Sequence, residues 1–323
     1  MTEVQALLLL SRLHQELGEA DTCESLLTEA LDKTRGPEWL GLRVRALHGL
    51  GSLRLTLGRY DQAEELLTEA LDLAETLDGA STGPATDAST GGAEGTDPLL
   101  LADVANELGV LYKTTGRLDE AHPMYLRALK IGEAALGPDH PKIATLHHNL
   151  GGLAFARGDL TEALRQGQLS VAIRERVLGP DHIETAADQA ALAAILTETG
   201  DHEQATDLLE HSLSVFQQAL GPEHPEIGST LHTLAAVQYR AGNIANAEST
   251  YRRALAIKEK ALGPTHPDLA ATLNNLALLW HKNGRPDLAE PAYRRCLTLL
   301  PADHPLRHAC AHNLDRMLAE STR

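Results

Sequence analysis

Leu136-Gly137-Pro138-Asp139-His140-Pro141 is a six-residue phrase that returns along the chain at a fixed distance. Its leucine recurs as Leu178, Leu220 and Leu262, a constant step of 42 residues. Self-similarity at a fixed period indicates a stack of repeated supersecondary units. The phrase also ends one helix and begins the next, because Gly permits the left-handed turn after a helix and Pro suits a first helical turn. The sequence therefore predicts a repeat protein whose units meet at this phrase.

The composition fits one elongated helical array better than two globular domains. Only 3% of the 323 residues are aromatic, Ala and Leu are abundant, and runs of strand-forming Val, Ile and Thr are absent. The formal net charge of −17 argues against a nucleic-acid-binding protein, which needs a basic face. Residues 1–80 hold fifteen acids against seven bases. A solvated helix surface explains that excess, and attraction of a basic partner is the alternative.

The ends and the cysteines give no sign of secretion or of a metal site. No basic segment follows Met1, and the apolar run 7–10 is too short for a signal core or a membrane span. Cys23, Cys296 and Cys310 lack metal-ligand spacing and are odd in number, so we expect reduced, buried thiols. We predict a cytoplasmic protein with no membrane and no nucleic-acid partner.

A second pattern lies between the phrases. In Leu276-Ala277, Gly284, Ala289 and Tyr293, a leucine precedes a small residue, a glycine follows the leucine by eight positions, and small and large residues then come at helical spacing. The same pattern begins again at Leu234 and at Leu108. It describes two antiparallel helices that meet across a tight turn.

This pattern resembles the tetratricopeptide repeat, and the 42-residue period with Leu-Gly-Pro-Asp-His-Pro linkers resembles the kinesin light chain type of that family. The common repeat is about 34 residues long, so the helices here are longer by about two turns in all. The resemblance covers nearly the whole chain. It implies an all-α, right-handed superhelical solenoid of about seven helix pairs plus a C-terminal capping helix.

The glycines between paired helices give the predicted domain boundaries. We predict two repeats in residues 1–77, a disordered Gly-, Ser- and Thr-rich insertion in 78–97, five repeats in 98–303 and a capping helix in 304–323. The insertion has almost no large apolar side chain, so it cannot bury enough surface to offset the entropy of ordering it. We expect it to act as a hinge between the second and third repeats.

Sixteen histidines invite a metal or catalytic interpretation. Five of them occupy one linker position, at His140, His182, His224, His266 and His304. Helix axes lie roughly 8–10 Å apart, too far for two such imidazoles to share a zinc ion easily, so we expect Asp-His-Pro to start a helix instead. Motifs of serine hydrolases, zinc proteases, phosphate loops and dinucleotide folds are absent. We therefore predict no enzyme activity, no catalytic residue, no metal site and no cofactor.

The candidate binding residues are those on the first helix of each pair that depart from the packing pattern. The family resemblance implies that first helices line a concave groove, and that positions just before the leucine and four to six after it face inward. Carried over by register, these positions are Asn106, Lys113, His148, Asn149, His232, Tyr239, Arg240, Asn274, Asn275, His281, Lys282 and Asn313.

An asparagine amide offers a donor and an acceptor together, which matches the backbone of an extended peptide. Tyr, Arg and Lys would add aromatic and cationic contacts. We therefore expect a non-catalytic scaffold or adaptor, monomeric or homodimeric, that holds a protein or peptide segment in its groove. Two alternatives stay open. The Asn and His side chains could instead cap helices or contact the adjacent repeat, and the array could be a bacterial regulatory peptide sensor that acts through a partner chain.

Overall fold

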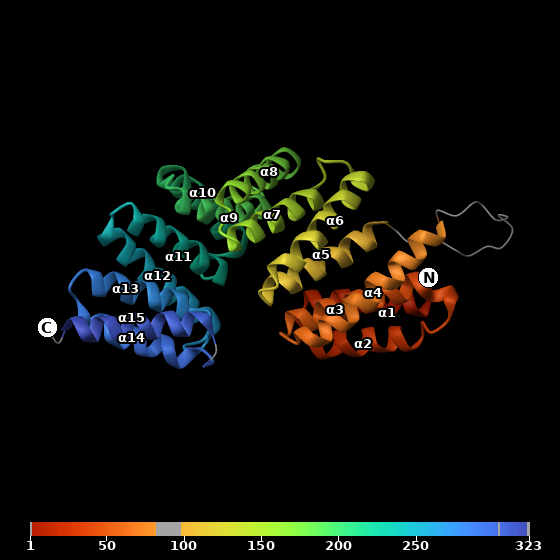
Figure 1. Cartoon of the computed structure of the whole chain (residues 1–323), viewed down its shortest axis with the longest axis horizontal. Coiled ribbons are helices and arrows are strands. Elements are labelled where there is room, and N and C mark those ends of the chain that lie inside the picture. Colours follow the sequence, from red (N-terminus) through yellow and green to blue (C-terminus); the bar gives the residue numbers. More distant parts are fainter. Residues whose placement is uncertain (1, 82–97, 303, 322–323) are drawn as a thin grey trace. The chain divides into compact units, whose positions relative to one another are not determined.

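The protein is described by a computed structural model over residues 2–81, 98–302 and 304–321. Every regular element within these residues is a helix (Figure 1). The helices fall into two compact units, Met1–Asp159 and Leu160–Arg323. The predicted insertion begins later than expected, because α4 continues to Ser81. Residues 82–97 lie outside the described residues.

The first unit contains seven α-helices and one short 3-10 turn among its described residues. They are α1 (Glu3–Glu16), α2 (Ala20–Asp32), η1 (Pro37–Trp39), α3 (Leu40–Thr56), α4 (Tyr60–Ser81), α5 (Pro98–Thr114), α6 (Leu118–Leu136) and α7 (Pro141–Ala156).

The second unit continues the alternation and ends on one unpaired helix. Its elements are α8 (Leu160–Leu178), α9 (Ile183–Thr199), α10 (His202–Leu220), α11 (Pro225–Arg240), α12 (Ile244–Leu262), α13 (Leu269–Lys282), α14 (Pro286–Leu299) and α15 (Pro305–Ser321). Within the residues that the structure describes, the order of elements agrees with the prediction of about seven helix pairs followed by a final helix.

The linker phrase folds as a helix end followed by a helix start. Gly137 adopts a φ of 80°, which L side chains rarely take, and Pro141 is the first residue of α7. Nδ1 of His140 accepts a hydrogen bond of 3.2 Å from the backbone N–H of Lys142. The other four linker histidines accept the same bond from the residue two positions on. This confirms the helix-start interpretation of the histidines.

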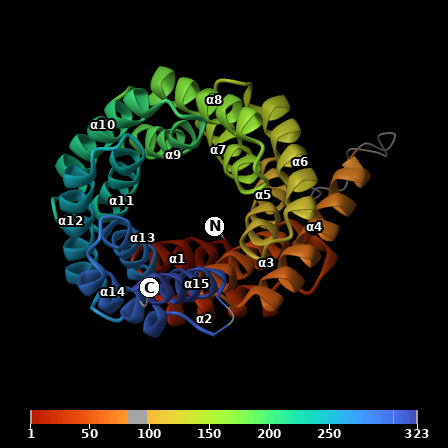
Figure 2. The same cartoon turned by 60° about the vertical axis from the view of Figure 1, so that its left-hand side comes forward.

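Each unit is built of two helix layers. In the first unit, α1, α3, α5 and α7 form one layer and α2, α4 and α6 form the other (Figure 2). In the second unit, α9, α11, α13 and α15 form one layer, opposite α8, α10, α12 and α14. Each odd-numbered layer has one surface that points away from the even-numbered helices. We call this surface the odd-helix face.

Small residues on the odd-numbered helices let the two layers approach closely. A Cβ at Gly109 of α5 would lie 2.6 Å from Cδ1 of Tyr125 on α6, a side chain with no exposed surface. A Cβ at Gly51 of α3 would likewise lie 2.7 Å from Cγ of Leu67 on α4. The large side chain of the even helix therefore fills the space that the missing side chain leaves.

The final helix packs its apolar side on the helix before it. Cys310, Leu314 and Met317 of α15 are buried in one cluster with Cys296 and Tyr293 of α14. Both thiols of this cluster, and that of Cys23, are free and buried as predicted.

Replacing Gly109 by Ala tests the close approach within a helix pair. Ala normally stabilises a helix interior by about 1 kcal/mol over Gly, but the new methyl must displace the Tyr125 ring, and overpacking costs about 1–3 kcal/mol. We expect Gly109→Ala to lower the free energy of unfolding by about 1–2 kcal/mol in urea titrations. Gly152→Ala is the matched control, because its Cβ would meet only the mobile amino end of Lys113. Equal stability of the two variants would contradict this packing account.

Candidate functional site

The sequence-predicted residues of the first unit lie on its odd-numbered helices. Asn106 and Lys113 are on α5, and His148 and Asn149 are on the neighbouring α7. All four side chains are half-buried. The structure brings the two asparagines together, since Nδ2 of Asn149 donates a hydrogen bond of 2.8 Å to Oδ1 of Asn106. This bond between neighbouring repeats uses one group of each amide, and each amide keeps further donor or acceptor capacity.

Lys113 is placed differently from the asparagines. Its amino group lies over Gly152 of α7, 2.7 Å from where a Cβ would stand. Burial lowers the pKa of Lys113, because a charged amine loses hydration there. Lys113 is therefore a partly desolvated cation on the odd-helix face.

An open hollow of about 810 Å³ lies on the same face of the first unit. Helices α1, α3, α5 and α7 contribute its lining together with Leu27 of α2. Its ionisable residues are Arg12, Arg45, His48, Asp103 and Lys142. Apart from the histidine, the lining thus holds three cations and one carboxylate, and Nζ of Lys142 pairs with that carboxylate at 2.9 Å. Burial lowers the pKa of His48, which favours its neutral form.

Charge in the first unit is divided between the two layers. Helix α2 carries four acids and α4 carries seven, and neither carries Lys or Arg. Helix α3 carries three arginines and no acid. Two of these, Arg43 and Arg54, form ion pairs with Glu69 and Glu24 of the even helices. The even-helix side is therefore strongly acidic, and the hollow opposite is not.

Sequence reasoning missed Arg12, Arg45 and Lys142 as members of the site. Arg45 and Lys142 fall outside the register positions carried over from the family, and Arg12 lies on α1, where no candidate was chosen. The signal that would have found Arg45 and Lys142 is the absence of acids from α3 and α7, whereas α1 carries two acids beside Arg12 and gives no such signal.

In the second unit the predicted residues form a line of hydrogen bonds across α11, α13 and α15. Nδ2 of Asn275 lies 3.4 Å from Nε2 of His232, and Nδ1 of that ring lies 3.0 Å from Oγ1 of Thr272. Nδ2 of Asn274 donates to Oδ1 of Asn275 at 3.3 Å, and Nδ2 of Asn313 donates to Oδ1 of Asn274 at 3.3 Å. Burial lowers the pKa of His232 to about 4, so this imidazole is neutral near pH 7.

The remaining predicted residues of the second unit lie near the ends of their helices. Nη2 of Arg240 donates to Oε1 of Glu198 at 2.6 Å. His281 lies 2.9 Å from Oε2 of Glu320 on α15. Tyr239 is half-buried beside the cluster around Tyr251, and Lys282 is exposed. Arg240 and His281 are therefore held by carboxylates of adjacent repeats.

Two further searches concern only the residues that the structure describes. No three His, Cys, Asp or Glu side chains gather so as to hold a metal ion in those parts of the chain. None of the helices described there is long and apolar enough to cross a membrane.

The fold and these faces define a class of protein: an all-α repeat protein that presents polar and cationic side chains along one layer of helices, an architecture suited to binding extended partners. The chain belongs to the tetratricopeptide repeat family, whose model matches residues 3–76, 100–175, 142–218, 187–260 and 229–302. Its 42-residue units resemble the TPR-like repeats of a putative kinesin light chain.

Several solved structures share this fold. A Rap protein complexed with competence and sporulation factor is 17% identical, with a TM-score of 0.67 over 98% of this chain and 89% of that one. BtubC (BKLC) from P. vanneervenii is 22% identical, with a TM-score of 0.57 over 80% and 92%. A putative kinesin light chain with nearly identical TPR-like repeats from Podospora anserina is 25% identical, with a TM-score of 0.52 over 68% and 98%. A search of the curated proteins finds no match.

A double-mutant cycle on Asn106 and Asn149 measures how much their contact contributes to the free energy of unfolding of the unliganded protein. We expect each Ala variant to destabilise the unliganded protein, with a coupling energy of about 0.5–1.5 kcal/mol between the two sites. Asn106→Ala combined with Asn243→Ala is the control, because Asn243 is exposed and its side chain forms no cap hydrogen bond. Additive effects in the Asn106/Asn149 cycle would show that the contact is energetically neutral and that these amides contribute nothing to the joining of the repeats.

Proposed function

We propose that the protein is a non-catalytic scaffold that binds an extended, acidic segment of a partner protein on the odd-helix face of its first unit. The observation that carries this proposal is the division of charge: a chain with a formal net charge of −17 keeps three cations and a single carboxylate around one hollow. A face of this kind attracts carboxylates, while the acidic even-helix side repels them.

The geometry supports an extended ligand rather than a compact one. Apart from Leu27 of α2, the hollow draws its lining from the odd-numbered helices α1, α3, α5 and α7, so a segment lying across them meets each of these helices in turn. The Asn106 and Asn149 amides lie on two of these helices, α5 and α7, and their unused groups suit the backbone of such a segment. Lys113 adds a cation that a ligand carboxylate would pair with at little dehydration cost, because burial has already removed part of its hydration.

The line of amides in the second unit supports a second contact surface of the same kind. Asn274, Asn275 and Asn313 present amide groups from α13 and α15, with Lys282 exposed near the end of α13. The Arg240 guanidinium pairs with Glu198, but both side chains are partly exposed, at 45% and 35%, so that pair is weak and exchangeable.

Selection from a random peptide library tests the sign of the ligand's charge. We expect the recovered dodecapeptides to be enriched in Asp and Glu, and their affinity to fall as salt rises. Arg45→Ala and Lys113→Met should each raise the dissociation constant of a selected peptide about tenfold, as expected for loss of a charged hydrogen bond. Fluorescence anisotropy measures this constant. Lys130→Met is the matched control, because Lys130 is an exposed lysine of the even helix α6. Recovery of basic or neutral peptides, or equal losses in all three variants, would overturn the proposal.

A regulatory peptide sensor is the second candidate. The fold is shared with a Rap protein that was solved in complex with competence and sporulation factor. A sensor needs two arrangements that its ligand binds unequally, whereas a scaffold does not. Small-angle scattering with and without a selected peptide separates the two functions. We expect an unchanged profile for the scaffold, and a ligand-dependent change in the profile would favour the sensor.

A further inference from the structure

We propose that a pocket between α5, α6 and α7 of the first unit binds a free apolar α-amino acid of about the size of leucine or phenylalanine. This site borders the proposed peptide-binding hollow and shares Asp103 and Lys142 with it, but it does not rest on the peptide-binding function. The pocket has a volume of about 240 Å³. An apolar cavity of about 150 Å³ is enough to hold a benzene ring, so there is room here for one such side chain and its head group.

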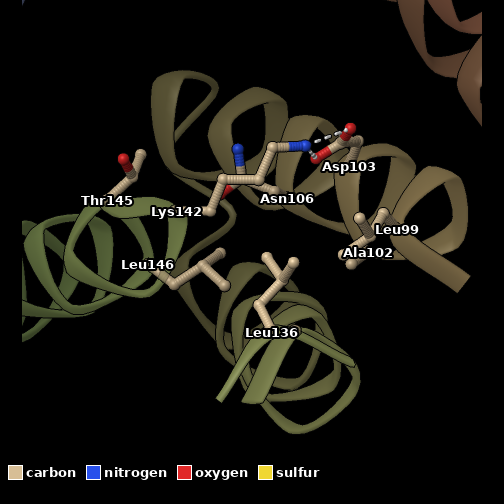
Figure 3. A pocket seen from close by; sticks show the side chains of 9 residues that line it. Leu99, Ala102, Asp103, Asn106, Leu136, Lys142, Thr145 and Leu146 are labelled. Carbon is tan, nitrogen blue, oxygen red and sulfur yellow. Dashed lines mark hydrogen bonds and ion pairs between the residues drawn. The ribbon is translucent and has the colours of Figure 1, made fainter. Parts of the chain in front are cut away.

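The walls of the pocket are apolar and its mouth is polar. Leu99 and Ala102 of α5, Leu136 of α6 and Leu146 of α7 surround the space in Figure 3. Asp103, Asn106, Lys142 and Thr145 complete the lining. An apolar side chain would be removed from water by the leucines, while a charged head group would remain at the polar side.

Gly132 lines this pocket and contributes no side chain to it. This glycine lies on α6, at the point where α6 faces the gap between α5 and α7. The same position, one period of 42 residues apart, is occupied by Arg174, Phe216, Lys258 and Leu300, all of them large and buried. Among these five positions only Gly132 leaves its gap without a side chain.

The mouth carries one charge of each sign. Nζ of Lys142 lies 2.9 Å from both carboxylate oxygens of Asp103, and Figure 3 shows the lysine stretched toward that aspartate. The side chains are 49% and 40% exposed, so the pair contributes little to stability and is easily separated. A zwitterion placed between them would give its carboxylate to Lys142 and its ammonium group to Asp103, so that both protein charges stay paired.

This pairing distinguishes a free amino acid from a residue within a peptide. A free amino acid has both charges on one carbon, whereas the N-terminal residue of a peptide keeps only the ammonium group and the C-terminal residue keeps only the carboxylate. An internal residue has neither. The apolar walls additionally select against small or polar side chains, which bury less apolar surface.

Isothermal titration of the full chain with L-leucine and L-phenylalanine tests the proposal. We expect saturable binding at one site per chain. N-acetyl-leucine and leucinamide, which each lack one charge, should bind about ten- to a hundredfold more weakly, and L-alanine should not bind measurably. Absence of leucine binding at 10 mM would overturn the proposal, where 10 mM is on the order of ten times the weakest dissociation constant expected for a specific small-molecule site.

Two variants that fill the pocket locate the site. Gly132→Leu places there the side chain that Leu300 supplies at the equivalent position, although its Cβ would lie only 3.0 Å from Cδ1 of Ile143. Thr145→Phe blocks the half-exposed mouth without a change in the core. We expect both to abolish leucine binding, with folding checked by circular dichroism melts. Lys142→Gln should weaken binding, and Lys130→Gln should not.

The outcomes separate this site from the peptide-binding face. Leucine binding that survives in folded Thr145→Phe, or equal affinity for leucine and N-acetyl-leucine, would overturn the amino-acid site. Selected acidic peptides should bind Thr145→Phe and the unaltered chain alike, since Thr145 does not line the peptide-binding hollow. Loss of peptide binding with leucine binding intact would instead count against the peptide-binding function alone.

Discussion

The close approach of the two helix layers is the constraint on which the rest of the structure depends. Gly109 has no side chain beneath the Tyr125 ring, and Gly51 has none beneath Leu67, so each odd helix lies directly on the large side chain of its partner. That contact fixes both the distance between the helices and their rotation. The residues of the odd-helix face keep their orientation only because the opposite side of each helix is held in this way.

The fold was predictable because it follows from local backbone rules that repeat. A glycine such as Gly137 ends a helix through its positive φ, and a following proline such as Pro141 begins the next, whatever lies around them. The linker histidines were predictable for the same reason, since His140 bonds to a backbone N–H two residues away. The sequence placed the start of the insertion at Asp78 because Gly79 follows directly, but α4 continues through this glycine to Ser81.

The partners of the site residues were not predictable from the same rules. Asn149 bonds to Asn106 and Asn275 lies against His232, residues that stand 43 positions apart, and the choice between such a contact and a free amide depends on tertiary distance. Register placed these residues on the correct helices but did not say which of their groups remain available. The cationic hollow needed the structure as well, because only there do Arg45 and Lys142 appear on one face while Arg43 turns to Glu69.

A repeat fold gains different chemistry at the few positions that its packing leaves unspecified. At the position of Gly132 in later repeats, Phe216 of α10 and Leu300, directly after α14, extend the core, whereas Arg174 of α8 bonds to Asp188 of α9. Lys258 lies across Gly228, whose missing side chain makes room for the lysine stem. Each of these residues is tolerated because neighbouring repeats hold the helices at a fixed distance. A change of residue therefore alters what fills the space between the helices, and the distance between their axes stays the same. Gly132 is the extreme case, in which the same spacing encloses space instead of a side chain.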